Sequence, residues 1–90
     1  MKTTQPLGIK IKRIRKSLKI SREQFAKLVG VPFTTLKNYE LMYRNVSATL
    51  LVNIATHPEL HKYALWLVSD EINPSIGQIE PPELPVKNKD

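Results

Sequence analysis

The chain has 90 residues, with 14 lysines and arginines against 8 acidic residues, and it contains no cysteine. This length fits one small domain, whose core is marginal unless a second chain shares it. A hydrophobic share of 41% is too high for a chain that is disordered throughout. The missing cysteines exclude a disulfide framework, a thiolate nucleophile and a cysteine zinc site.

Neither a membrane span nor a secretory signal is predicted. The longest apolar run, residues 64–68, is far shorter than the ~20 residues that cross a bilayer. The first residues lack the apolar stretch of a signal peptide. We therefore expect a cytoplasmic protein.

The net charge of +6 is concentrated near the N-terminus. Residues 1–22 hold eight lysines and arginines and no acid, whereas residues 23–90 hold six bases and eight acids. This uneven distribution of charge favours a protein with one surface that binds a polyanion, although a basic run can equally be the solvated face of a helix. Charge alone therefore names no partner.

A first helix is predicted over residues 7–18. Its apolar residues are spaced by four, three and four and form one stripe, made of Leu7, Ile11, Ile14 and Leu18.

A second helix is predicted over residues 22–29. Ser21 is its N-cap, and Gln24 completes a capping box. Its expected inward residues are Phe25, Ala26 and Leu28. Gly30 ends this helix, because a residue there often takes a positive φ.

Val31-Pro32 starts a third helix, which runs to about Glu40 and turns Leu36 and Tyr39 inward. A loop over residues 42–46 precedes a fourth helix, which Ser47 caps and which ends near residues 56–57. Its apolar residues are Leu50, Leu51 and Ile54.

A fifth helix is predicted from Pro58, and its residues 63–68 are apolar on every side. The helical pattern ends after Asp70, where Ile76 and Ile79 are interpreted as a short strand. We thus predict an all-α fold of five helices with a short extended C-terminal segment. Residues 1–56 and 57–82 form two parts of a single domain, and residues 83–90 form a disordered tail.

Residues 20–41 carry the most informative pattern. Ala26 lies four residues before Gly30, where two helices that cross closely need a small side chain. A shared core then holds both helices at a fixed angle, and its members are Phe25, Val31, Leu36 and Tyr39. This spacing predicts a helix-turn-helix, whose second helix enters the major groove of DNA.

The pattern resembles the lambda-repressor and Cro type of helix-turn-helix over about residues 7–55. The matching residues are Ser21, Glu23, Phe25, Ala26, Val29, Gly30, Val31, Thr35, Leu36, Tyr39, Glu40, Ser47, Leu50, Leu51 and Ile54. Residues 30–40, 61–67 and 73–81 are similar to the short C repressors of P-two-like temperate phages. That resemblance implies a lambda-repressor-like fold in a homodimeric immunity repressor. Such a protein binds operator DNA in its bacterial host, blocks an early lytic promoter and so maintains lysogeny.

Residues that face outward on and around the third helix are the candidate DNA contacts. Lys37 can donate to guanine and Asn38 can pair with adenine, whereas Phe33 either packs on a thymine methyl or shields the turn. The predicted base contacts are Phe33, Thr34, Lys37 and Asn38. The predicted phosphate contacts are Arg22, Gln24, Thr35, Tyr43, Arg44, Asn45, Lys10, Arg13 and Arg15.

A helix that is apolar on all sides is stable only if every side is buried, and a chain of 90 residues has few other residues to bury it. We therefore expect a homodimer interface, in which tryptophan and tyrosine are common anchors. Its predicted residues are Tyr63, Leu65, Trp66, Leu67, Val68, Ile76 and Ile79. The alternative is a core helix covered by the chain's own tail, and both descriptions can hold in part.

No pattern indicates catalysis, a metal, a cofactor or a small-molecule ligand. His57 and His61 lack a third ligand nearby, and Asp70-Glu71 fits a helix end better than a catalytic pair. No glycine-rich phosphate loop is present, so we do not expect an enzyme. Two regulatory alternatives stay open, an antitoxin and another host or prophage regulator, as does a protein-interaction module without DNA binding. The resemblance also leaves room for an antirepressor as a partner.

Overall fold

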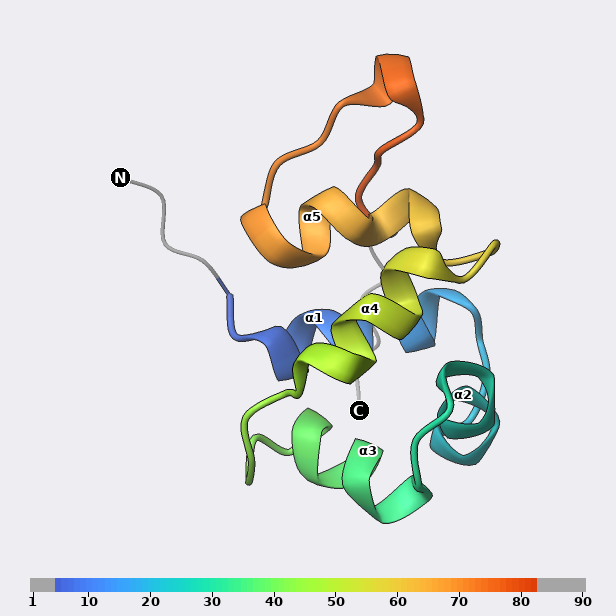
Figure 1. The fold of residues 1–90 in the computed structure, drawn as a ribbon, viewed down its shortest axis with the longest axis vertical. Coiled ribbons are helices and arrows are strands. Elements are labelled where there is room, and N and C mark those ends of the chain that lie inside the picture. The colour runs from blue at the N-terminus through green and yellow to red at the C-terminus, as the bar shows by residue number, and fades with distance from the viewer. Residues whose placement is uncertain (1–4, 83–90) are drawn as a thin grey trace, which may run out of the picture.

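Capping groups and glycines set the limits of the helices. The computed structural model describes residues 5–82, and within them lie five α-helices and two short 3-10 helices (Figure 1). The α-helices are α1 (Leu7–Ser17), α2 (Arg22–Val29), α3 (Phe33–Glu40), α4 (Ala48–Thr56) and α5 (Ala64–Ser69). The 3-10 helices are η1 (His61–Tyr63) and η2 (Pro74–Ile76). The prediction of an all-α fold is confirmed for this part of the chain, in which no helix is long and apolar enough to cross a membrane.

The predicted start and end of α2 are confirmed. The Gln24 amide donates to the Ser21 hydroxyl at 3.1 Å, and the Ser21 amide donates to the Gln24 side chain at 2.9 Å, which completes the capping box. Gly30 has φ 76° and ends the helix in the left-handed conformation. Ser47 caps α4 in the same manner by accepting from the Leu50 amide at 3.2 Å.

Side chains from every α-helix share one core. Its buried apolar members are Ile11, Ile14, Phe25, Ala26, Val29, Leu36, Tyr39, Leu50, Ile54, Leu60, Tyr63, Trp66 and Leu67. The expected inward position of Leu28 is wrong, because Leu28 is exposed and Val29 is buried instead. Residues 25, 26 and 29 lie on one side of a helix, whereas residue 28 lies beside that stripe.

The predicted fifth helix is much shorter than expected. His57 has φ −77° and ψ 131°, the extended conformation that a following proline favours, so the chain turns at Pro58 instead of starting a helix. The Leu60 and His61 amides both donate to the His57 carbonyl, at 3.0 and 2.8 Å. The six residues of α5 follow η1 and pack on α1 (Figure 1).

The predicted strand around Ile76 and Ile79 is also wrong. Residues 74–76 form η2, and a single antiparallel bridge joins Asn73 to Gln78. The resulting hairpin projects from the molecule beyond α5 (Figure 1). Gln78 fastens its base, because the side chain accepts from the Leu65 amide at 2.9 Å and donates to the His61 carbonyl at 3.0 Å. The predicted disordered tail, residues 83–90, lies outside the described residues.

Candidate nucleic-acid interface

Helices α2 and α3 form the pair that the sequence predicted as a helix-turn-helix. Ala26 is 2% exposed at their junction, and its carbonyl accepts a hydrogen bond from the Val31 amide at 3.0 Å. The buried side chains of Phe25 and Leu36 pack in the same core. The turn is therefore short and closely packed, so α2 holds α3 in place.

Helix α1 also touches α3, through a glycine that sequence reasoning missed. A Cβ atom at Gly8 would overlap the Tyr39 carbonyl oxygen, so no larger residue fits without moving one helix. The signal for it in the sequence is a glycine inside a helical pattern, which often marks such a close approach. Contacts with α1 and α2 together position α3.

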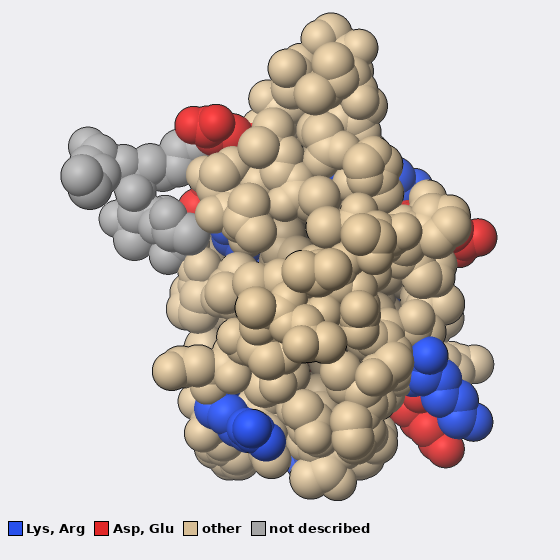
Figure 2. All heavy atoms as spheres, viewed as in Figure 1, with Lys and Arg blue, Asp and Glu red and all other residues tan. Residues whose placement is uncertain are grey.

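The outward face of α3 is open to solvent. Phe33, Thr34 and Lys37 are exposed, while Thr35 and Asn38 are half-buried. The Asn38 carbonyl accepts from the Tyr43 amide at 2.8 Å and ties down the following loop. The predicted base contacts thus lie on a helix that the core fixes from behind. In the view of Figure 2, the lysines and arginines that protrude furthest lie in the lower half, at the level of α2 and α3.

Glu40 joins three helices at the end of α3. Its side chain has no exposed surface, and it pairs with Arg15 through contacts of 2.8 and 3.0 Å. Arg22, at the start of α2, reaches the same carboxylate at 2.9 Å. The predicted phosphate contact of Arg15 is wrong, because this guanidinium is buried against Glu40 and also donates to the Ile20 carbonyl at 3.1 Å. Sequence reasoning gave Glu40 no such role, although an acid on the inward side of a helix was the available signal.

Lys10 lies in the core, so its predicted phosphate contact is wrong. Its side chain is 0% exposed and forms an ion pair with Asp70. The ammonium also donates to the carbonyls of Trp66 and Leu67, at 3.0 and 3.2 Å. A buried ammonium needs such partners, and these come from the C-terminal end of α5, where helix carbonyls attract cations.

Arg13 is engaged within the chain as well. Its Nη2 atom lies 3.2 Å from Glu80 and donates to the Pro81 carbonyl at 3.1 Å, and its guanidinium stacks 5.0 Å from the centre of the Trp66 ring. A phosphate contact by Arg13 would have to replace this pairing. Of the seven bases in residues 5–22, the part of this segment that the structure describes, four thus form ion pairs inside the protein, Lys10, Arg13, Arg15 and Arg22. These basic side chains therefore stabilise the fold through ion pairs, and they are not all available to bind a polyanion.

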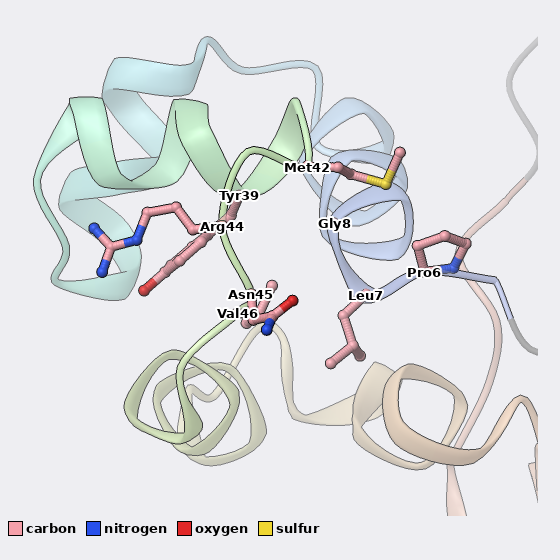
Figure 3. Close-up of a pocket in the computed structure, with 8 residues that line it drawn as sticks. All are labelled: Pro6, Leu7, Gly8, Tyr39, Met42, Arg44, Asn45 and Val46. Carbon is pink, nitrogen blue, oxygen red and sulfur yellow. The ribbon is translucent and has the colours of Figure 1, made fainter.

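The loop after α3 carries an exposed aromatic side chain, Tyr43, and a positively charged one, Arg44. Tyr43 is 76% exposed, Asn45 is exposed, and the Arg44 guanidinium lies 5.7 Å from the centre of the Tyr39 ring. Figure 3 shows Arg44 extending alongside Tyr39, away from Leu7. A pocket of about 320 Å³ separates this loop from the start of α1, and it is lined by Pro6, Leu7, Gly8, Tyr39, Met42, Arg44, Asn45 and Val46.

The predicted dimer residues divide into two groups. Tyr63, Trp66 and Leu67 are 3%, 4% and 1% exposed in the chain's own core, so their assignment to an interface is corrected. They are buried because α5 packs one face on α1. The other predicted residues reach the surface, with Leu65 half-buried and Val68, Ile76 and Ile79 exposed. Ile72, which the prediction missed, is exposed beside them.

Comparisons with known proteins agree with this geometry. The family model described as helix-turn-helix matches residues 11–61, which include α2, α3 and α4. Repressor protein C of Escherichia phage P2 is 42% identical over 72 residues, which cover 80% of this chain and 73% of that protein. The predicted resemblance is therefore confirmed. The chain belongs to the XRE-type helix-turn-helix family of DNA-binding transcription regulators, and within that family to the C repressors of P2-like phages.

Proposed function

We propose that this DNA-binding repressor maintains lysogeny of a temperate phage by occupying an early lytic promoter as a homodimer. The observation that carries the proposal is the outward face of α3, which presents Phe33, Thr34 and Lys37 from a helix fixed by Glu40. A helix held in this way can enter the major groove without a cost in rearrangement. The similarity to a phage repressor of nearly the same length supports the choice of biological setting.

Base recognition is assigned to the exposed first turns of α3. Thr34 and Lys37 can hydrogen-bond base edges, and Asn38 joins them if its half-buried side chain reaches. The proposed phosphate contacts lie on α3 and on the segments next to it, and they are Arg22, Gln24, Thr35, Tyr43, Arg44 and Asn45. Arg22 keeps an exposed fraction of 27% while it pairs with Glu40, so part of its guanidinium is available to DNA.

Residues 57–82 are the proposed dimerisation part. Val68 on α5 and Ile76 on the hairpin are 61% and 68% exposed, and Ile72 and Ile79, next to the two ends of the hairpin, add further aliphatic surface. The upper projection in Figure 2 carries uncharged atoms over most of its surface. Exposed apolar surface of this kind is typical of protein interfaces. A homodimer would bring two α3 helices to two half-sites of an operator.

Repression is tested with a reporter gene placed behind the intergenic DNA next to the repressor's own gene. The wild-type protein should silence the reporter, and the double variant Thr34→Ala/Lys37→Ala should release it at equal protein concentration. Thr49→Ala, exposed on α4 outside the proposed DNA surface, is the control and should still repress. Full repression by the double variant would refute the assignment of α3.

Dimerisation is tested by sedimentation. Ile76→Asp places a charge on the hairpin and should produce monomers. Val52→Asp, at another exposed aliphatic residue, on α4, should leave the dimer intact. A wild-type protein that sediments as a monomer at micromolar concentration would contradict the homodimer. So would a dimer that Ile76→Asp leaves unchanged.

A further inference from the structure

Phe33 is the first residue of α3, and its aromatic side chain is exposed. The chain contains two phenylalanines: Phe25 is fully buried in the core, whereas Phe33 is 46% exposed. Burying an aromatic side chain normally stabilises a fold, and Phe33 gives up much of that stabilisation. The exposed part of Phe33 lies beside Thr34 and Lys37, the exposed residues proposed to contact bases, so it is available to the same DNA surface.

Phe33 has a second exposed apolar residue next to it at this end of α3. Pro32 stands at the N-cap, is exposed, has no amide hydrogen and makes no side-chain capping bond. Lys37 follows Phe33 by four residues and is exposed on the same side of the helix. The first turn thus offers hydrophobic surface, and the second turn offers a cationic donor.

Only one feature of the major groove matches a hydrocarbon ring. Adenine, guanine and cytosine present hydrogen-bond donors and acceptors there, whereas thymine adds its C5-methyl group. A phenyl ring pressed on a polar base edge would remove water without replacing its hydrogen bonds, which is unfavourable. Phe33 therefore favours thymine and disfavours the other three bases by the same contact.

We infer that Phe33 is a specificity-determining residue that reads the C5-methyl group of a thymine in each operator half-site. This inference rests on the proposed function and names part of the DNA sequence that the repressor recognises. Phe33 and Lys37 are about 6 Å apart along the helix axis, at ~1.5 Å per residue, and base pairs are spaced by ~3.4 Å. Where Lys37 reads a guanine, that base should lie within about two base pairs of the thymine.

The test starts from the tightest duplex selected by the wild-type protein from a random DNA pool. Each thymine of that duplex is then replaced singly by deoxyuridine, which removes the methyl group and nothing else. At one position per half-site the dissociation constant should rise about fourfold, the factor expected for one buried methyl-sized group. A change to cytosine at that position should weaken binding further, and 5-methylcytosine should restore part of the loss.

Variants separate the ring from the rest of the helix. Phe33→Ala should bind the thymine and deoxyuridine duplexes equally, and Phe33→Leu should keep part of the difference. Val52→Ala, at an exposed residue of α4, should behave as the wild type. Equal wild-type affinity for every deoxyuridine duplex would overturn the inference, as would a preference that survives in Phe33→Ala, while the repressor assignment would stand in both cases. Failure of the pool to enrich any sequence would instead overturn the proposed function.

Discussion

The ammonium group of Lys10 donates a hydrogen bond to the main-chain carbonyl of Trp66 and lies 5.2 Å from the centre of its indole ring. These residues are 56 positions apart in the sequence. Their contact fastens α1 to α5. Helix α1 touches α3, the helix proposed to bind DNA, and α5 leads into the exposed hairpin. The two parts of the chain are thereby joined in one folded unit.

Lys10→Met should lower the free energy of unfolding by roughly 3–5 kcal/mol, because it removes one partner of a buried ion pair. Lys16→Met is the matched control, since Lys16 lies exposed on the same helix, and it should change stability by no more than about 0.5 kcal/mol. Urea unfolding followed by circular dichroism measures both. Equal stabilities of the two variants would contradict the buried position of Lys10.

Glu40→Gln should destabilise the fold by roughly 3 kcal/mol, because two guanidinium groups lose their shared carboxylate. It should also weaken DNA binding beyond the loss of folded protein, since Arg15 and Arg22 then no longer fix the end of α3. Glu23→Gln, at an exposed residue of α2, is the control for the loss of one acidic charge. Unfolding of Glu40→Gln and Glu23→Gln at the same urea concentration would contradict this role of Glu40.

Gly8→Ala tests the close contact between α1 and α3, because the contact decides whether the substitution raises or lowers the free energy of unfolding. Helix propensity alone predicts that alanine stabilises the helix by about 0.5–1 kcal/mol. The added methyl group would overlap the Tyr39 carbonyl, so we expect a net loss of roughly 1–3 kcal/mol instead. Thermal unfolding gives the sign directly, and a stabilised variant would show that the two helices are not in contact at this point.

Lys37→Ala and Arg44→Ala should affect DNA binding in different ways. Lys37 is proposed to read a base, so its removal should relax the preference at one position of the operator and leave other sequences nearly unaffected. Arg44 is proposed to hold a phosphate, so its removal should weaken all sequences alike. It should also reduce the slope of binding affinity against salt concentration by about 1 for each protomer of the homodimer. Competition binding with single-base operator variants distinguishes the two outcomes. A uniform loss of affinity in Lys37→Ala together with a changed base preference in Arg44→Ala would contradict the assignment of α3 to the major groove.

Local rules were enough to predict the helix-turn-helix. Ser21, Gly30 and Ser47 mark helix limits through their own backbone and hydroxyl chemistry, and the structure has those limits where the sequence placed them. Ala26 likewise identified the helix crossing from the spacing of two small residues. These features depend on residues only a few positions apart, so both interacting residues can be recognised in one short stretch of sequence.

Long-range pairing could not be predicted in the same way. Lys10 and Arg15 look like exposed bases of an amphipathic helix, and only the placement of Asp70 and Glu40 shows that they are buried. The assignment of Trp66 failed for a related reason. An apolar run indicates burial, but which surface covers it depends on how α5 packs on α1.

Titration of the wild-type protein against the intergenic DNA beside its own gene, at several salt concentrations, tests the central claim most directly. We predict a sequence-specific complex whose affinity falls roughly a hundredfold between about 50 and 200 mM salt, because Arg22 and Arg44 of the two protomers would neutralise about four phosphates. A scrambled duplex of the same composition should bind far more weakly at every salt concentration. Equal affinity for the two duplexes would contradict the account.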